Sequence, residues 1–310
     1  MTLHILQERA QLLRDTRHFF YQRDVLEVET PALSQASTTD PYIETCAVVR
    51  NGDVRYLHSS AEYAMKRLLV AGSGDIYQIC KVWRGDEIGR HHNPEFTMLE
   101  WYRLDYSYRQ LMEEVDALLQ HLIQHIKKPS QFFSYQQLFL DRLAIDPHEA
   151  DHATLLKCLV SQSINIISTL ELDSSAILDL LMTHCIEPTL SKDCLTFIYD
   201  YPASQKALSR LSEDQQVAQR FEVYFGSVEL GNGYQEETCG VENQRQLQND
   251  LERRLALGKV GVPIDECFLA AMQQGMPQCA GVALGLDRVL MCRCQKKSLE
   301  DVIALTWAVA

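Results

Sequence analysis

One stretch of the chain, residues 84–102, combines side chains that can bind a nucleotide and a cationic substrate. It reads RGDEIGRHHNPEFTMLEWY, with a polar loop between two strand-like runs. Because side chains alternate along a strand, we expect Phe96, Met98, Glu100 and Tyr102 on one face. An aromatic ring, a carboxylate and a phenol suit a base and a cation better than a hydrophobic core, since a buried unpaired carboxylate costs several kcal/mol. An ordinary hairpin with one amphipathic face is the alternative.

Three carboxylates spaced seven residues apart, those of Glu222, Glu229 and Glu236, follow farther along the chain. Hard oxygen ligands suit Mg²⁺, so Glu222 and Glu229 can hold this ion against phosphates. The Asn232-Gly233 pair is expected to form a turn that returns Glu236 toward the site. Carboxylates on the surface of an edge strand are the alternative.

Residues 281–288, GVALGLDR, read as a small-residue strand that runs into a helix. Small residues let a ligand approach the backbone closely. The first helical turn would present Arg288 beside backbone N–H groups, which suits a phosphate. A strand end next to a surface arginine is the alternative.

A polar loop with Ser60 and Glu62 opens another helix. Ser60 can act as its N-cap, and Glu62 can simply oppose the helix dipole. The functional alternative is that the Glu62 carboxylate receives an ammonium group.

Hydrophobic periodicity predicts helices alternating with antiparallel strand pairs, the pattern of an α+β sheet domain. Helices are expected over residues 5–22, 62–70, 107–126, 135–144, 152–162, 174–184, 242–257 and 286–294. Strands are expected over residues 25–29, 75–83, 95–103, 195–199, 221–230 and 280–285, with a hairpin around 51–53. The helix-rich segment from about 104 to 192 carries no evident chemistry and is interpreted as an insertion in one domain spanning residues 1–310.

Composition favours a globular protein of the cytoplasm. The 310 residues carry 29 basic and 42 acidic side chains, and the net charge of −13 argues against a general nucleic-acid binder. A local basic cluster that includes Lys66, Arg84 and Arg103 is compatible with that balance. No apolar run is long enough to span a bilayer and no signal peptide is recognisable, so neither a membrane nor export is expected. The ten cysteines include no C-x-x-C pair and are expected to be reduced core residues.

Three segments, Arg17 to Pro31, Arg84 with its loop, and Gly281 to Arg288, resemble motifs 1, 2 and 3 of the class II aminoacyl-tRNA synthetases. HNPEFTMLE at 92–100 and ELGNG at 229–233 are similar to lysyl-tRNA synthetase. VETP, KRLLVAG, YPASQ and GVALG most closely resemble the short lysyl-tRNA-synthetase paralogues that modify elongation factor P, the EpmA (PoxA/GenX) family. The resemblance covers essentially the whole chain and implies the class II catalytic domain, a mainly antiparallel β-sheet flanked by helices.

The resemblance implies an ATP-dependent, AMP-forming ligase that activates (R)-β-lysine as an acyl-adenylate. The activated group would pass to the ε-amino group of a specific lysine on elongation factor P. ATP and Mg²⁺ are the implied cofactors, and a homodimer is implied because motif 1 packs the dimer interface in class II enzymes. The chain begins about 15 residues before the motif 1 region, which leaves no room for an N-terminal anticodon-reading domain, so no tRNA anticodon recognition is expected.

The family also implies a role for each matched residue. Arg84 would hold the α-phosphate, where negative charge builds during adenylation, and Arg288 would hold the γ-phosphate. The other implied ATP contacts are Gly85, Asp86, His92, Asn93, Phe96 (which would stack on adenine), Glu229, Leu230 and Gly285. The implied amino-acid contacts are Ser60, Ala61 and Glu62 at the reacting end, and Glu100, Tyr102 and Glu236 at the far ammonium. Glu222 and Glu229 would coordinate Mg²⁺.

Four positions depart from the synthetase pattern. Gly85-Asp86 replaces the usual Asn-Glu of motif 2, so either Asp86 or Glu87 takes the place of that glutamate. Ala61 stands where a proline is usual, and Ala283 stands where the synthetase has glycine. One added methyl in a tight pocket shifts discrimination by roughly 1–3 kcal/mol.

Two rival functions stay open. One is a compact ligase that charges a different acceptor, either a tRNA or a small amine. The other is a non-catalytic paralogue that senses an amino acid, although Arg84, Glu229 and Arg288 are all present.

Overall fold

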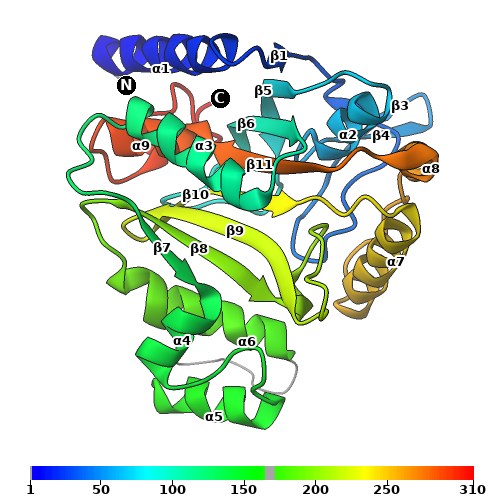
Figure 1. The fold of residues 1–310 in the computed structure, drawn as a ribbon. Coiled ribbons are helices and arrows are strands. Elements are labelled where there is room, and N and C mark those ends of the chain that lie inside the picture. Colours follow the sequence, from blue (N-terminus) through cyan, green and yellow to red (C-terminus); the bar gives the residue numbers. More distant parts are fainter. Residues whose placement is uncertain (1, 165–171) are drawn as a thin grey trace. The chain divides into compact units, whose positions relative to one another are not determined.

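The chain folds into two compact units with helices and strands in each. The computed structural model describes residues 2–164 and 172–310. Unit 1 comprises residues 2–125 and 236–310, and unit 2 comprises residues 126–235 without the undescribed 165–171, which fall in the predicted helix-rich insertion. The predicted α+β class is confirmed (Figure 1). The prediction of one catalytic domain with an insertion stays a prediction.

Unit 1 contains a sheet in which the residues of the first motif share a face, as predicted. Its strands, in spatial order, are β1 (Leu26–Glu27), β5 (Ile76–Trp83), β6 (Glu95–Leu104) and β11 (Cys279–Gly285). β6 pairs antiparallel with both β5 and β11. On the β11 side Glu100 lies opposite Ala283 and Tyr102 lies opposite Gly281. Because paired residues point to the same side of a sheet, one face carries the small residues of β11 beside the carboxylate and phenol of β6.

The opposite face of this sheet is mostly apolar and is packed by α1 (Leu3–Tyr21), α3 (Tyr108–Leu122) and α9 (Leu286–Arg293). The Phe20 ring of α1 stacks on Tyr77 with ring centroids 4.4 Å apart and meets the fully buried Trp101 edge-on. Aromatic burial of this kind contributes about 0.5–1.5 kcal/mol per pair beyond the buried area. The two faces of one sheet therefore have separate tasks, packing on one side and chemistry on the other.

A buried carboxylate fixes where α9 begins. Asp287, 1% exposed, accepts a 2.6 Å hydrogen bond from the backbone N–H of Thr97 in β6 and forms an ion pair with Arg9 of α1. These bonds hold the first turn of α9, and with it Arg288, against the sheet.

The rest of unit 1 surrounds the polar face. A small antiparallel sheet is formed by β2 (Leu33–Ser34), β3 (Cys46–Arg50) and β4 (Asp53–Leu57). The predicted hairpin around 51–53 is confirmed, and Asn51 and Gly52 adopt φ of +53° and +83°. The remaining helices are α2 (Glu62–Val70), α7 (Gly240–Ala256) and α8 (Glu266–Gly275). No helix was predicted at α8, which packs on α2 through stacked Tyr63 and Phe268 rings.

Unit 2 has its own sheet and its own helices. Its strands, in spatial order, are β10 (Val228–Gln235), β9 (Val217–Phe225), β8 (Leu195–Pro202) and β7 (Gln131–Ser134). Helices α4 (Tyr135–Leu143), α5 (His152–Ser161) and α6 (Ser174–Leu181) lie together beside these strands (Figure 1). A π-helical turn over Met182–Ile186 continues α6. Their shared core contains Phe139, Leu159, Ile177 and Leu181, all fully buried.

Two predictions in this region are wrong. The strand expected over 221–230 is two strands, β9 and β10, joined by a turn at Gly226, which adopts φ of +59°. The turn expected at Asn232-Gly233 does not occur, because both residues lie inside β10 opposite Glu222 and Phe221. Pairing with β9 satisfies the backbone of the Asn-Gly pair, which overrides its local preference for a turn.

The predicted helices and the other predicted strands lie within a few residues of the observed ones. Among residues 2–164 and 172–310, no helix is both long and apolar enough to cross a membrane.

Candidate active site

A buried cluster of charged side chains lies where α2 begins beside the polar face of the unit 1 sheet. Lys66, one turn after Glu62 in α2, is completely buried. Its Nζ lies 2.6 Å from Glu62 Oε1 and 2.6 Å from Glu236 Oε2. Glu236 is 1% exposed, so the alternative that it sits on the surface of an edge strand is wrong. Lys66, which lies near other basic residues in the sequence, adds no exposed positive charge, since its ammonium is enclosed between two carboxylates.

Glu100 is the third carboxylate of this cluster, and three neutral donors hold it. Its Oε2 accepts from the Ser60 hydroxyl at 2.7 Å and from the Ala61 backbone N–H at 3.1 Å. Its Oε1 accepts from the Tyr102 hydroxyl at 2.6 Å. Ser60 Oγ in turn accepts from the backbone N–H of Glu62 at 3.0 Å. The N-cap position of α2 is Ala61, so Ser60 bonds to the helix start from one residue earlier than an N-cap.

Gly281 makes room for this cluster in β11. A Cβ atom at position 281 would lie 2.4 Å from Glu236 Oε1 and 2.4 Å from Tyr102 Cε1. We predicted that the small residues of this strand allow a close approach to the backbone. At Gly281 the approaching groups are side chains of the protein itself. Ala283, opposite Glu100, is partly exposed and lies on the same face.

Burial dominates the electrostatics of the cluster. It raises the pKa of Glu100 to about 7, and the nearby Glu62 carboxylate adds to the rise. It likewise raises the pKa of Glu236 to about 7, even though Lys66 opposes the shift. Burial alone would lower the pKa of Lys66, but the Glu236 and Glu62 carboxylates raise it above its usual value, so the ammonium stays charged. The cluster therefore holds three carboxylates and one ammonium, which pairs with two of them, and it has capacity for a further cation.

Arg84 follows β5 and rests beside the Phe96 ring, with its Cζ 5.3 Å from the ring centroid. Its Nη1 lies 3.3 Å from Glu87 Oε1, so the carboxylate that contacts Arg84 is that of Glu87 rather than Asp86. Within the described residues, the buried Nε of Arg84 has no hydrogen-bond partner. A guanidinium with an unused donor suits a phosphate oxygen. Gly85 donates its N–H to the backbone oxygen of Glu44 at 3.0 Å.

Arg288 holds the loop that follows Arg84. Its Nε donates to the backbone oxygen of His91 at 3.1 Å, and its Nη2 lies 2.8 Å from His92 Nε2. Because arginine can only donate, His92 Nε2 accepts and the ring is neutral. Burial and then the Arg288 charge lower the pKa of His92, which agrees with a neutral ring.

The other predicted nucleotide contacts of unit 1 lie close by in the chain. The Asn93 side chain donates to the backbone oxygen of Glu95 at 2.6 Å and accepts from the N–H of Trp307 at 3.0 Å. A Cβ at Gly285 would meet only Arg288 side-chain atoms, at 3.7 Å or more. The protein itself therefore has room for a larger residue at Gly285.

The two carboxylates predicted to hold magnesium lie in unit 2. Register places Glu229 opposite Tyr224 and Asn232 opposite Glu222, so both carboxylates are on one face of the β9–β10 pair. Glu222 is largely buried, accepts from the Tyr224 hydroxyl and forms an ion pair with Arg220. Leu230 is buried at a bulge just after Glu229.

Four residues that shape the site were not predicted from the sequence as site residues. They are Lys66, Gly281, Arg220 and Asp287. The i,i+4 spacing of Glu62 and Lys66 on a predicted helix was a usable signal for the first ion pair. The alternation of Arg220, Glu222 and Tyr224 along one strand was a signal for the second.

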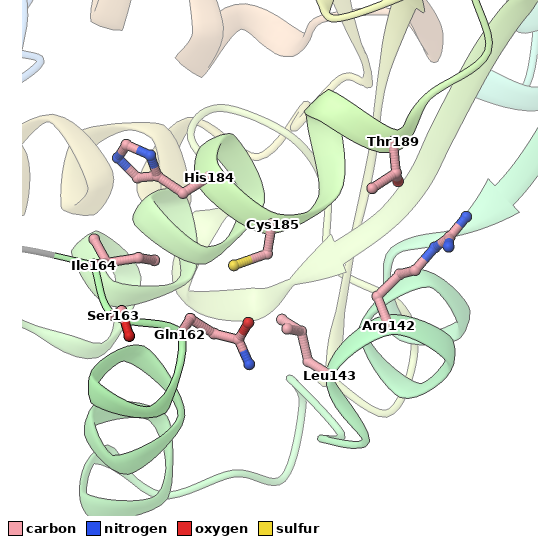
Figure 2. Close-up of a pocket in the computed structure, with 8 residues that line it drawn as sticks. All are labelled: Arg142, Leu143, Gln162, Ser163, Ile164, His184, Cys185 and Thr189. Atoms are coloured by element: carbon pink, nitrogen blue, oxygen red, sulfur yellow. The ribbon is translucent and has the colours of Figure 1, made fainter.

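A separate cavity lies among the helices of unit 2. Its volume is about 720 Å³, and residues of α4, of the segment after α5 and of the π-helical turn line it. Figure 2 shows the Cys185 thiol and the Gln162 amide pointing toward its centre. None of the predicted site residues lines this cavity.

The comparisons with known proteins agree with the geometry. The family model for class II tRNA synthetases (D, K and N) matches residues 1–307, and the chain belongs to this family. Two similar relatives are named elongation factor P–(R)-β-lysine ligase. The one from Pectobacterium atrosepticum is 45% identical and the one from Salmonella typhi is 46% identical, each over 308 residues that cover 97% of this chain and 94% of the relative. The chain therefore has the class II tRNA synthetase fold and is a ligase.

The raised pKa of Glu100 predicts a pH-dependent stability. The pKa of this carboxyl is near 4.5 in the unfolded chain and about 7 in the folded protein. The stability that the protonated carboxyl contributes is therefore fully present below pH 4.5 and is lost as the pH rises through about 7. Replacing Glu100 by Gln, which cannot ionise, should leave stability near the wild-type level at pH 5. The variant should become more stable than wild type above pH 7, by up to about 3 kcal/mol.

Urea unfolding of wild type and Glu100→Gln between pH 5 and 8.5 measures this difference. Glu213→Gln, at an exposed position, is the matched control and should stay within about 0.5 kcal/mol of wild type throughout. A difference between Glu100→Gln and wild type that does not vary with pH would contradict the raised pKa.

Proposed function

We propose that this protein activates (R)-β-lysine with ATP and transfers it to the ε-amino group of a lysine on elongation factor P. The observation that carries the proposal is the identity of 46%, across 97% of the chain, with a ligase named for that reaction. The buried anionic cluster of unit 1 supports it, because a substrate with two ammonium groups adds positive charge where three carboxylates share one ammonium.

In the first step a carboxylate oxygen of the amino acid attacks the α-phosphorus of ATP. The bond from that phosphorus to the bridging oxygen of the β-phosphate breaks, and pyrophosphate leaves. We assign Arg84 to the α-phosphate, because its Nε donor is unused within the described residues, and Phe96 to the adenine ring. We assign Arg288 to the γ-phosphate, which would replace its bonds to the His91 backbone and the His92 ring. Gly85, Asp86, Asn93 and Gly285 complete the proposed ATP contacts of unit 1.

The amino acid would bind over the polar face of the sheet. Ser60, Ala61 and Glu62 receive the reacting end with its amine, and Glu62 is the most exposed carboxylate of the cluster, with 23% of its side chain open to solvent. Glu236, Glu100 and Tyr102 receive the far ammonium. Ala283, opposite Glu100, narrows the space beside it. Catalysis would rest on positioning and on stabilisation of phosphate charge, without a protein nucleophile.

Magnesium would be held in unit 2 by Glu222 and Glu229, which share one face of the β9–β10 pair. Mg²⁺ typically takes one or two protein carboxylates together with phosphates and waters. Two carboxylates fit that need, and within residues 2–164 and 172–310 no group of three or more His, Cys, Asp or Glu is placed to hold a metal. The ion would share Glu222 with Arg220 and Tyr224. When bound, it would neutralise phosphate charge.

In the second step the lysine nitrogen of elongation factor P attacks the acyl carbon, AMP leaves with the bonding electrons, and the nitrogen loses a proton to give an amide. We further propose a homodimer, a cytoplasmic location and no anticodon recognition. The rival acceptors are a tRNA or a small amine, and the rival from another class is an inactive amino-acid sensor.

The acceptor is tested by incubating the protein with labelled (R)-β-lysine, ATP and Mg²⁺ in the presence of elongation factor P or of total tRNA. We expect label on elongation factor P, with a mass increase of one β-lysyl group, and none on tRNA above background. Label on tRNA alone would overturn the proposed acceptor and would favour a compact synthetase.

The role of Arg84 is tested by Arg84→Ala. Loss of a charge aimed at the α-phosphate should lower the rate of substrate-dependent ATP–pyrophosphate exchange by about a hundredfold or more. Arg50→Ala, at an exposed position of β3, is the control and should keep the wild-type rate. Exchange that survives Arg84→Ala would show that the assignment is wrong.

A further inference from the structure

Lys66 is the one member of the anionic cluster for which the proposed reaction has no task. It is completely buried in α2, and its Nζ lies 2.6 Å from a carboxylate oxygen of Glu62 and 2.6 Å from one of Glu236. A buried ammonium loses its hydration, which costs free energy that only its ion-pair partners can offset. The residue is therefore more than a filler of space between the helix and the sheet.

The ammonium of Lys66 sets the distance between two carboxylates from different parts of the chain. Both oxygens touch the same nitrogen, so they cannot be farther apart than twice 2.6 Å. Without a cation between them, two like charges would move apart or one would take up a proton. Glu62 is anchored in the first turn of α2, and Glu236 packs against Gly281, so Lys66 joins two fixed supports.

These two carboxylates are the ones assigned above to the two ammonium groups of the substrate. In β-lysine the amino groups are on carbons 3 and 6, and in α-lysine they are on carbons 2 and 6. The two isomers have the same atoms but differ in the separation of their positive charges. A pair of carboxylates held at a fixed distance can distinguish them by that separation.

On the basis of the proposed function, we propose that Lys66 is a positioning residue that fixes the separation between the Glu62 and Glu236 carboxylates. This fixed separation makes the site select a diamino acid by the distance between its two ammonium groups. Lys66 itself does not touch the reacting atoms. It acts through the two carboxylates, in addition to any contribution of Ala283 to the choice between the two isomers.

The test compares kcat/KM for (R)-β-lysine and L-α-lysine in ATP–pyrophosphate exchange, in wild type and in two variants. Lys66→Arg keeps the positive charge but introduces a wider, planar group that spreads the carboxylates. We expect it to lower the preference for β-lysine over α-lysine by about tenfold or more, the range for one methylene of misfit. The loss should fall on the KM for β-lysine, while the KM for ATP stays within about twofold.

Lys66→Met removes the charge and should lower the same preference further, with a lower melting temperature because the buried Glu236 and the partly exposed Glu62 lose their cation. Arg67→Met, at the exposed neighbouring position of α2, is the matched control and should leave both preference and melting temperature unchanged. If Lys66→Arg slows both isomers equally, with the preference within twofold of wild type, Lys66 is structural only and the inference is overturned.

A substrate series on the wild-type enzyme keeps the inference testable even if neither variant folds. Exchange is measured with 3,5-diaminopentanoic, 3,6-diaminohexanoic and 3,7-diaminoheptanoic acid, which differ in the number of methylene groups between the two amines. The inference expects a sharp optimum at one separation, and a flat response would overturn it. Absence of exchange with every diamino acid in the wild type would instead mean that the proposed function itself is wrong.

Discussion

The structure of unit 1 around the site depends on placing three carboxylates and one ammonium together, with Lys66, Glu100 and Glu236 buried and Glu62 partly exposed. Each carboxylate has a different support: Glu62 is in a helix turn, Glu100 bonds to three neutral donors, and Glu236 lies beside Lys66 and Gly281. Unpaired charges at these positions would cost several kcal/mol each. The cluster therefore requires that the start of α2, the middle of β6 and the small residue in β11 meet with little freedom.

The nucleotide half of the site is built differently. Arg84 and Arg288 are partly exposed, and they rest on partners that an incoming phosphate can displace, namely the Glu87 carboxylate, the His91 backbone and the His92 ring. Asp287 holds the helix that carries Arg288 but leaves its guanidinium able to change partners. The amino-acid half is thus pre-organised by buried charge, and the nucleotide half is held by contacts that an incoming phosphate can displace.

Local patterns in the sequence were enough to predict most elements and the shared face of Phe96, Met98, Glu100 and Tyr102, since alternation along a strand follows directly from backbone geometry. The motif residues came from a family resemblance, and the family itself is confirmed. What failed depends on long-range pairing. Asn232-Gly233 is a turn pair by local preference but lies in a ladder with β9. The burial of Lys66 could not be predicted from local sequence, because its partner Glu236 is far along the chain.

The most direct test of the account is ATP–pyrophosphate exchange by the purified protein with (R)-β-lysine, (S)-β-lysine or L-α-lysine as the only amino acid. The account predicts strong exchange with (R)-β-lysine and much weaker exchange with the other two. A preference for L-α-lysine would contradict the proposed substrate and point to a compact lysyl-tRNA-synthetase-like ligase. No exchange with any of the three would contradict the adenylation chemistry itself.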